Sequence, residues 1–536
     1  MPDHASEAEA REFATAFSAF LSWIHDSDRE TAERNPVAAL VADFLGRDGA
    51  AHSVVSRDLP VFEHVNLQTA INAWSARDSR TVDVQGVLLP QHYRMELQEI
   101  VSAESLPPVR LTAPALTDLA NGPASTLGCL KLALLLVSDD RGRYVLLVQG
   151  PGEHHPTLEV EIAGLPVREA QSVLAELDQL RSELNVYRGH LLDVALGPMG
   201  GVILSFAVQP RLHRDDVVLP DAVLGRVERH ALGVAAHRQA LLAAGQHLKR
   251  GLLLYGPPGT GKTHTTRYLL GQMTGYTRLI LTGRALVAVG SVTELARDLQ
   301  PSVVVLEDVD LVAEDRSMGP ASSPVLFDLL DAMDGAAPDA DLLFLLTTNR
   351  ADLLEPALAA RPGRVDVAVE IELPDAPARE RLLALYGRGV PLALTPEDIA
   401  AAVERTDGTT ASFLKELIRR SVLEALHDTE RPDTEPTDPG EPAGAPRGPA
   451  SSPQEPGSAA PGASVPAVTG AHLARALDDL LDSAQGVTRT LLGVGVDPAA
   501  LPAGGALAGS GWAGQAGPAA AMFQRRAMVS RRVYRG

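Results

Sequence analysis

A glycine-rich loop with a single lysine is the part of the sequence best suited to hold phosphate groups. It reads GPPGTGKT, follows the apolar run RGLLLY and precedes a stretch of helical character. Glycines let the backbone wrap a phosphate with its N–H groups, the helix N-terminus adds its dipole, and Lys262 adds a positive charge. The hydroxyl of Thr263 can bind Mg²⁺. We expect phosphate and metal contacts from Gly256, Pro257, Pro258, Gly259, Thr260, Gly261, Lys262, Thr263 and His264.

Two acidic residues end an apolar run further along the chain. The run VVVLEDVD stops on Glu307 and Asp308, and a third carboxylate follows at Asp310. Next to a phosphate-binding loop, a carboxylate at the end of a parallel strand holds the metal, and a second group orients the attacking water. We assign Glu307 to the metal and Asp308 to the water. The alternative is that these acids only cap a strand.

Polar groups also follow the next apolar run, LLFLLTTNR. Asn349 would lie at a strand end, where its amide can contact the γ-phosphate or the attacking water. The segment ARPGRVD then places Arg361 and Arg364 on one loop. Arginines at that point can neutralise the charge that develops on a transferred phosphoryl group.

Strands and helices must alternate to bring these groups together. Between residues 220 and 427, continuous apolar runs are separated by helical patterns, which is typical of a parallel sheet with helices on both faces. The loop, the acids and Asn349 then share the carboxyl edge of that sheet. A helical segment follows at about 376–427. The fold class predicted here is α/β, a P-loop NTPase with a helical lid subdomain.

The order GPPGTGKT, LEDVD and TTNRADLLEPALAARPGRVD resembles the AAA family of ATPases, over about residues 215–427. The resemblance implies ATP and Mg²⁺ as cofactors, ATP hydrolysis, and a homo-oligomeric ring, usually hexameric, with nucleotide between subunits. Arg361 and Arg364 would then serve the neighbouring subunit's ATP. The resemblance also places Gly225 and Gly408 near the adenine, although Thr409, Thr410 and Ala411 depart from the family's pattern after Gly408.

Two further departures concern mechanism. The acidic pair reads Glu-Asp instead of the family's usual Asp-Glu, and resembles a variant that occurs within the family. Asp308 is one methylene shorter than Glu, so backbone placement must supply the reach to the water. The position of the family's aromatic pore loop carries Ala288, Val289 and Gly290. Alanine cannot grip an extended peptide as an aromatic ring would. Threading of a peptide through the ring is therefore a weaker prediction than ATP hydrolysis.

The rest of the chain divides by composition and periodicity. Short alternating or β-branched runs from about 80 to 210, with a helix at 167–185, indicate a separate α+β domain. A stretch rich in Pro, Gly, Ala and Ser cannot bury enough surface to order itself. The expected units are N-terminal helices (1–55), the α+β N-domain (56–212), the large α/β subdomain (213–375), the helical lid (376–428), a disordered insertion (429–466), the last lid helix (467–486) and a tail with a basic end (487–536).

Composition excludes several classes of function. A formal net charge of −21 disfavours nucleic acid as a partner, although a local basic groove stays possible. No apolar run is long enough to span a bilayer, and the acidic start lacks the pattern of a signal peptide, so we expect a cytoplasmic protein without a membrane partner. The single cysteine, Cys129, is expected to be a packed thiol. GEHHP, residues 152–156, lacks the spacing of an HExxH zinc site.

Two functions fit these patterns. The first is an ATP-driven remodeller, in which the N-domain recruits a client protein of unknown identity and the ring converts hydrolysis into domain motion. The second is a nucleotide-gated assembly factor or scaffold, which binds partners without threading them. The N-domain segment NVYRGHLLDV is interpreted as a turn into a strand at Leu191, and the alternative is a recognition loop. The basic C-terminal tail is either solvated or a docking peptide.

Overall fold

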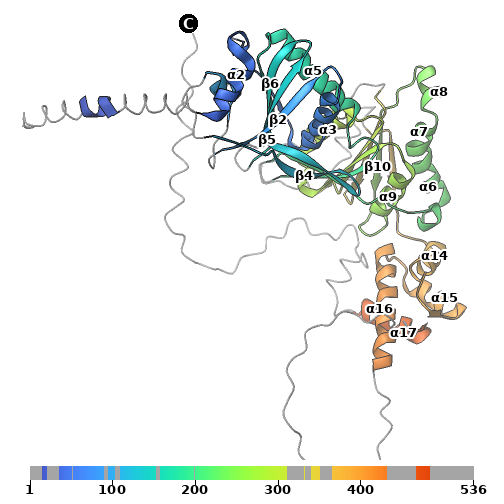
Figure 1. The fold of residues 1–536 in the computed structure, drawn as a ribbon. Helices are drawn as coiled ribbons and strands as arrows, with labels where there is room; N and C mark the ends of the chain where they lie inside the picture. The colour runs from blue at the N-terminus through green and yellow to red at the C-terminus, as the bar shows by residue number, and fades with distance from the viewer. Residues whose placement is uncertain are drawn as a thin grey trace, which may run out of the picture. The chain divides into compact units, whose positions relative to one another are not determined.

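A computed structural model shows two seven-stranded sheets and a helical subdomain that contains a two-stranded sheet (Figure 1). The chain divides into two units, 1–494 and 495–536, and all described residues belong to the first. The structure describes residues 15–20, 35–50, 52–89, 95–102, 109–152, 157–197, 200–310, 331, 333, 340–350, 365–430 and 466–482. The predicted insertion, apart from residues 429, 430 and 466, and the predicted tail lie outside these residues, as does most of the helix expected near 324–333.

The first sheet is antiparallel, with strand order β1-β7-β6-β5-β2-β3 and β4 paired to the first half of β5. Its strands are β1 (Val55–Leu59), β2 (Thr81–Leu88), β3 (Arg110–Thr112), β4 (Ala115–Gly122), β5 (Ser125–Asp139), β6 (Gly142–Gln149) and β7 (Leu158–Ala163). The helices of this region are α2 (Pro36–Ala50), η1 (Val61–Glu63), α3 (His64–Ser75), α4 (Leu97–Ser102) and α5 (Val167–Glu183).

Both faces of this sheet are covered, which explains the continuous apolar run of β5. Leu134 and Leu136 pack with side chains of α2 and α4, whereas Leu135 and Val137 pack with side chains of α3 and α5. Successive residues of a strand point to opposite faces, so a strand covered on both sides must be apolar throughout. The α+β character predicted for this region is therefore present, although α3 was not predicted from the sequence.

The second sheet has the order β14-β10-β13-β12-β11-β8-β9, and all neighbours are parallel except β8 and β9. Its strands are β8 (Leu191–Leu196), β9 (Val202–Phe206), β10 (Arg250–Tyr255), β11 (Thr277–Thr282), β12 (Ser302–Glu307), β13 (Leu342–Thr348) and β14 (Val367–Glu370). The helical segments around it are η2 (Arg214–Asp216), α6 (Asp221–Glu228), η3 (Arg229–Gly233), α7 (Val234–Ala236), α8 (Arg238–Ala243), α9 (Lys262–Gln272), η4 (Gly283–Ala288) and α10 (Val289–Asp298). Side chains of α6 and α9 pack on one face and side chains of α10 on the other, which confirms the predicted fold class.

The predicted boundary at residue 212 does not coincide with the edge of this sheet. Strand β8 pairs in parallel with β11, and β9 pairs with β8, so the sheet includes residues 191–206. The segment before β8 is bound to it as well, because the Arg188 guanidinium donates to the carbonyls of Asp298 and Gln300. Tyr187 is buried and its hydroxyl donates to the Phe62 carbonyl. NVYRGH is therefore a structural turn, as predicted.

The helical subdomain is discontinuous in sequence. It contains α14 (Ala376–Tyr386), β15 (Leu392–Ala393), α15 (Pro396–Arg405), α16 (Ala411–Glu430), β16 (Val468–Thr469) and α17 (Gly470–Leu481). Leu473, Leu477 and Leu480 of α17 share a core with Phe413 and Leu417 of α16. Strand β16 also pairs with β15. The segment between α16 and β16 is thus an insertion within this subdomain.

A buried carboxylate fixes the start of the parallel sheet. Asp341 accepts hydrogen bonds from Arg250, the first residue of β10, and from the hydroxyl of Tyr276, the residue before β11. It also forms an ion pair with Arg238. Removing one partner of a buried pair leaves an uncompensated charge, here that of Arg250, and typically costs about 3–5 kcal/mol. We expect Asp341→Ala to lower the thermal midpoint by about 10 °C.

The control for Asp341 is the same substitution at an exposed ion pair. Arg405 and Asp478 are 41% and 66% exposed, and such pairs contribute about 0–1 kcal/mol. Differential scanning calorimetry of both variants measures the difference between their thermal midpoints. Equal midpoints for Asp341→Ala and Asp478→Ala would contradict a structural role for the Asp341 cluster.

Candidate functional site

The glycine-rich loop forms a strand-loop-helix unit at the carboxyl edge of the parallel sheet. It begins where β10 ends at Tyr255, and α9 begins at Lys262. Gly256 has φ 141°, and a Cβ there would lie 2.3 Å from the Ile371 carbonyl oxygen, so only glycine fits. Gly261 has φ 111°, and a Cβ on it would meet no atom within 4 Å. The loop therefore borders open space at the N-terminus of α9, where backbone N–H groups favour an anion.

Lys262 is held under this loop by backbone carbonyls. Its Nζ donates to Gly256 and Pro257, at 2.8 Å each, and the residue is only 5% exposed. Burial lowers the pKa of the ammonium to about 8, against the opposing effect of Asp308 and Asp310. Keeping Lys262 charged in this buried position is unfavourable in free energy unless a bound anion compensates its charge.

This lowered pKa predicts a pH dependence of nucleotide affinity. The charged form of Lys262 binds phosphate, and its pKa of about 8 belongs to the protein without an anion. As pH rises through about 8 the free protein loses this charge, and affinity should fall, by up to tenfold per pH unit. Titration calorimetry with ATP between pH 7 and 9.5 measures how steeply the ATP affinity falls with pH. Lys262→Arg keeps its charge throughout, so it should flatten the profile; an equal slope in both proteins would contradict this assignment.

Glu307 ends β12 on the face that carries α9. Its neighbours Val303 and Val305 share a core with Tyr268 and Leu269 of α9, and alternation along the strand puts Glu307 on the same side. Burial raises the pKa of the carboxyl, Arg267 lowers it, and Asp308 and Asp193 raise it. A partly buried carboxylate beside the α9 N-terminus is suited to a divalent cation, because a cation lowers the cost of keeping it ionised.

Asp308 has a left-handed backbone, with φ 51°, and no other non-glycine residue in the described part of the chain has a positive φ. Strain of this kind is held by surrounding contacts and is concentrated at functional sites. Two contacts hold it here: the Asp308 N–H donates to Thr347 Oγ1 at 3.0 Å, and the Asn349 amide donates to Asp308 Oδ1 at 3.4 Å. The structure thus brings together the predicted residues Asp308 and Asn349.

Asp310 and the end of β13 support this arrangement. Asp310 is 5% exposed, and its Oδ1 accepts from Thr348 Oγ1 at 3.0 Å and from the Asn349 N–H at 3.2 Å. The backbone of Asn349 is therefore fixed by the third carboxylate of the acidic run. Asp310 was recognised from the sequence as a third carboxylate without a role, and Thr347 and Thr348 were not predicted. The doublet TT before Asn349 is the signal that could have indicated hydroxyl donors there.

The helical subdomain contacts the phosphate-binding loop through the start of α16. The Ser412 N–H and hydroxyl both donate to the Gly259 carbonyl, at 3.1 and 3.3 Å. A Cβ on Gly259 would lie 3.0 Å from Ser412 Oγ and 3.1 Å from Thr410 Oγ1. A second connection runs through Asp216, whose carbonyl oxygen lies 2.9 Å from His264 Nε2 and whose carboxylate pairs with Arg388 of the helical subdomain. Asp216 and Ser412 were not predicted from the sequence.

The two glycines assigned to the adenine lie in different settings. Gly408 has φ 70° in the turn before α16, and a Cβ on it would meet no atom within 4 Å. The contact with the loop comes instead from Thr410 and Ser412, a few residues later. Gly225 lies within α6, where its nearest side-chain neighbour is Arg229. Their roles toward adenine stay predictions.

The segment aligned with the pore loop is helical. Ala288 ends η4, and Val289 and Gly290 begin α10. Val289 is 1% exposed and belongs to the core, whereas Val287 is 58% exposed. The apolar residue that this segment presents to solvent is thus Val287 instead of the predicted triplet. Arg361 and Arg364 lie outside the described residues.

Comparison with known proteins identifies the region that carries this site. The family described as "ATPase family associated with various cellular activities (AAA)" matches residues 252–373, which include the loop, β12 and β13. These residues form an AAA-family P-loop ATPase domain. The strand order, the phosphate-binding loop and the acidic end of β12 agree with this assignment.

Known relatives of the AAA domain belong to larger proteins. The chain is 32% identical over 201 residues to the ATP-dependent zinc metalloprotease FtsH of Thermus thermophilus, covering 35% of this chain and 32% of the relative. It is 36% identical over 205 residues to FtsH 4 of Sphaerobacter thermophilus, covering 35% and 30%. It is 30% identical over 201 residues to the cell division cycle protein 48 homolog of Archaeoglobus fulgidus, covering 35% and 27%. The chain spans about a third of the length of these relatives.

The residues of the AAA domain fit Mg²⁺ bound together with a triphosphate. Mg²⁺ in such sites takes one or two carboxylates, with phosphates and water as the remaining ligands. Thr263 at the start of α9 and Glu307 at the end of β12 supply the hydroxyl and the carboxylate. In the described part of the chain no cluster of three or more His, Cys, Asp or Glu residues could hold a metal alone. None of the described helices combines the length and apolar character needed to cross a bilayer.

Proposed function

We propose that this chain hydrolyses ATP at the AAA site. Lys262 and the loop N–H groups bind the phosphates, and Thr263 and Glu307 hold Mg²⁺, which neutralises phosphate charge when bound. Asp308 orients the attacking water and accepts its proton, and Asn349 holds Asp308 in place. The hydrogen bond between Asn349 and Asp308 is the observation that carries these roles.

We further propose that hydrolysis drives motion of the helical subdomain. Its α16 hydrogen-bonds the phosphate-binding loop at Gly259, and Arg388 pairs with Asp216, which in turn contacts His264. Loss of the γ-phosphate changes the conformation of the loop. The Gly259 carbonyl, which α16 hydrogen-bonds, transmits this change to α16. Such a shift of a packed helix is a common output of ligand-driven switching.

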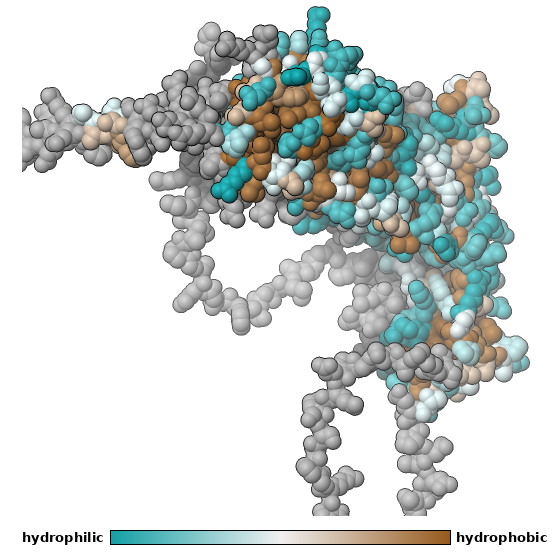
Figure 2. Space-filling view, viewed as in Figure 1, coloured by the Kyte–Doolittle hydropathy of each residue, from teal (hydrophilic) through white to brown (hydrophobic). Residues whose placement is uncertain are grey.

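The client of this remodeller is proposed to bind the N-terminal region. Figure 2 shows apolar residues gathered on one face of that region. In the same N-terminal region, the large apolar side chains that are exposed include Val84, Leu88, Leu111 and Leu116, on strands β2, β3 and β4. Contiguous exposed apolar surface is typical of protein interaction sites. We propose a homo-oligomeric ring, hexameric by analogy with the family, in which Arg361 and Arg364 face the neighbouring subunit's nucleotide.

A nucleotide-gated scaffold is the second candidate. Val289 is buried and no aromatic residue lies at Ala288 or Gly290, so this segment has no aromatic side chain to grip an extended chain. A protein that binds partners without threading them needs no such grip.

Capture of partners with an ATP-bound variant distinguishes the two candidates. Asp308→Asn protein with ATP is used to isolate partners from cell extract, and each partner is then incubated with the unaltered protein and ATP. Loss of the partner's native fold or assembly, with stimulated ATP turnover, supports the remodeller. Nucleotide-dependent binding that leaves the partner intact supports the scaffold. Sedimentation of the same variant with and without ATP tests the ring, which a monomer under both conditions would contradict.

A further inference from the structure

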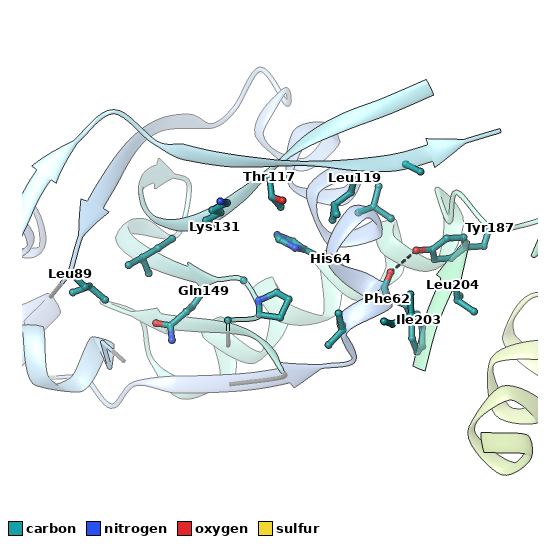
Figure 3. A pocket seen from close by; sticks show the side chains of 17 residues that line it. Phe62, His64, Leu89, Thr117, Leu119, Lys131, Gln149, Tyr187, Ile203 and Leu204 are labelled. Atoms are coloured by element: carbon teal, nitrogen blue, oxygen red, sulfur yellow. Dashed lines mark hydrogen bonds between the residues drawn. The ribbon is translucent and has the colours of Figure 1, made fainter. Parts of the chain in front are cut away.

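The N-terminal region contains a cavity and a groove beside helix α3. The cavity, about 640 Å³, lies at the start of α3 and borders β4 and β9 (Figure 3). There the Tyr187 hydroxyl donates to the Phe62 carbonyl at 2.8 Å, which ties η1 to the segment before β8. The groove, about 450 Å³, lies further along α3, between this helix and β2. We call it the α3–β2 groove, and its lining residues take no part in the nucleotide site.

The α3–β2 groove has one wall from a helix and one from a strand. The side chains of the helix wall recur at the three- and four-residue spacing of one helical face, and they are Gln68, Ile71, Asn72 and Ser75. On the strand wall, Val82 and Val84 lie opposite Val137 and Leu135 of β5. Residues that lie directly opposite each other share a face of the sheet, so Val82 and Val84 are on the face that α3 covers.

The outer edge of β2 is open over its first five residues. Strand β3 pairs with residues 86–88 only, and no other strand in the described part of the chain pairs with residues 81–85 on that side. A Cβ on Gly86 would lie 2.4 Å from the Ala113 carbonyl oxygen, so the chain before β4 crosses β2 there and closes that end of the groove. An open edge offers unpaired main-chain groups to another strand.

Val82 and Val84 direct their main-chain groups to this open edge. Residues of an antiparallel strand bond alternately to the strands on its two sides. On β5, Lys131 accepts from the Gly150 N–H, so the odd-numbered residues of β5 bond to β6 and the even-numbered ones bond to β2. The β2 residues opposite those even-numbered ones are Thr81, Asp83 and Gln85. The N–H and C=O groups of Val82 and Val84 therefore point away from β5.

These main-chain groups select an extended peptide, and strand alternation selects its side chains. A peptide residue opposite Val82 or Val84 places its side chain over the groove, on the α3 face. An apolar side chain fits there, because Arg80 at the end of the groove is 4% exposed and already pairs with two carboxylates. The peptide residue between these two lies opposite Asp83, an exposed carboxylate on the other face, where lysine or arginine fits.

We propose that the open edge of β2 binds an extended segment of a client protein by antiparallel strand addition. Two apolar side chains of the segment lie in the α3–β2 groove, and a basic side chain between them pairs with Asp83. Strand addition of this kind is a common mode of peptide recognition, in which main-chain bonds give affinity and alternate side chains give specificity. The inference rests on the proposed client binding by the N-terminal region, and it needs no ATP hydrolysis.

A fluorescein-labelled peptide of sequence TVRVT, with an amidated C-terminus, tests this site by anisotropy titration with the full chain. We expect saturable binding of one peptide per chain. N-methylation of both valines removes the donors that face the edge of β2 and should weaken binding by about tenfold or more. N-methylation of the arginine should have little effect, because in this pairing its N–H points away from β2. Equal binding of the two methylated peptides would overturn strand addition.

A charge reversal at Asp83 tests the basic side chain. Asp83→Arg should weaken binding of TVRVT by about threefold to tenfold and strengthen binding of TVEVT by a similar factor. Asp118→Arg, the same change at an exposed position of β4, is the matched control and should leave both affinities unchanged. Equal peptide affinities in the two variants would overturn the assignment of Asp83.

The remaining outcomes separate this inference from its competitors and from the proposed function. Self-association of the chain that Asp83→Arg alters, without peptide binding, would make a second copy the occupant and overturn the client assignment. ATP turnover without binding of TVRVT would overturn the inference and leave the proposed hydrolysis in place. Peptide binding without ATP turnover would do the reverse. The ATP affinity of each variant serves as a check of folding, because neither residue belongs to the nucleotide site.

Discussion

Asp308→Asn should reduce ATP turnover by about 10²–10⁴-fold while leaving ATP affinity nearly unchanged. The carboxylate at this position accepts the proton of the attacking water, and an amide cannot. The phosphate contacts come from the loop and Lys262, which the substitution does not touch. Asparagine is also one of the few residues that tolerates the left-handed backbone found at position 308. The local structure should therefore survive.

Asp193→Asn is the matched control for this prediction. Asp193 lies on β8 and raises the pKa of Glu307 by its charge, so it is an acid close to the site that does not take the water position. Phosphate release in steady state and ATP binding by calorimetry are measured for both variants. Turnover by Asp308→Asn equal to that of Asp193→Asn would remove Asp308 from the reaction. Loss of ATP binding by the Asp308→Asn protein would instead show that Asp308 contributes to nucleotide binding.

The left-handed backbone also gives a physical reason for the order Glu-Asp. Aspartate adopts this conformation more readily than glutamate, because its short polar side chain can bond locally. Here Asp308 Oδ1 accepts from Asn349, and the Asp308 N–H donates to Thr347. A shorter acid at this position thus matches the local backbone. The sequence showed that backbone placement must compensate for the missing methylene, but φ itself was not accessible from the sequence.

The residues of the site that depend on local backbone chemistry could be predicted from the sequence. Gly256 and Lys262 identify a strand-loop-helix unit because their roles are set by conformation and charge within eight residues. Glu307 and Asp308 were found because an apolar strand ends on them. In each case the signal and its consequence lie close together in the chain.

Features that depend on long-range pairing could not be predicted. The β8–β9 hairpin has the same alternating pattern as the strands of the first sheet, and only its pairing with β11 assigns it to the AAA sheet. The role of Asp310 depends on the register between the ends of β12 and β13, which brings Thr348 within 3.0 Å. Val289 is buried because η4 runs directly into α10, whereas the family's pattern suggested an exposed loop.

Lys262→Met should weaken ATP binding by about 10²–10⁴-fold. The ammonium is held under the loop by the Gly256 and Pro257 carbonyls, and two charge-assisted hydrogen bonds to phosphate contribute about 3–6 kcal/mol together. Methionine matches the length of the side chain and removes only its charge and donors. The protein should stay folded, because loss of the bonds to Gly256 and Pro257 is offset by removal of a buried charge whose pKa is already depressed to about 8.

Lys415→Met, on the exposed face of α16, controls for the general effect of removing a lysine. Calorimetric titration with ATP in the presence of Mg²⁺ gives the affinities, and thermal unfolding of each protein without nucleotide gives the stabilities. A Lys262→Met protein that binds ATP within tenfold of the unaltered affinity would show that the loop N–H groups alone hold the phosphates. A large fall in its thermal midpoint would instead show that Lys262 is chiefly a structural tie between the loop and α9.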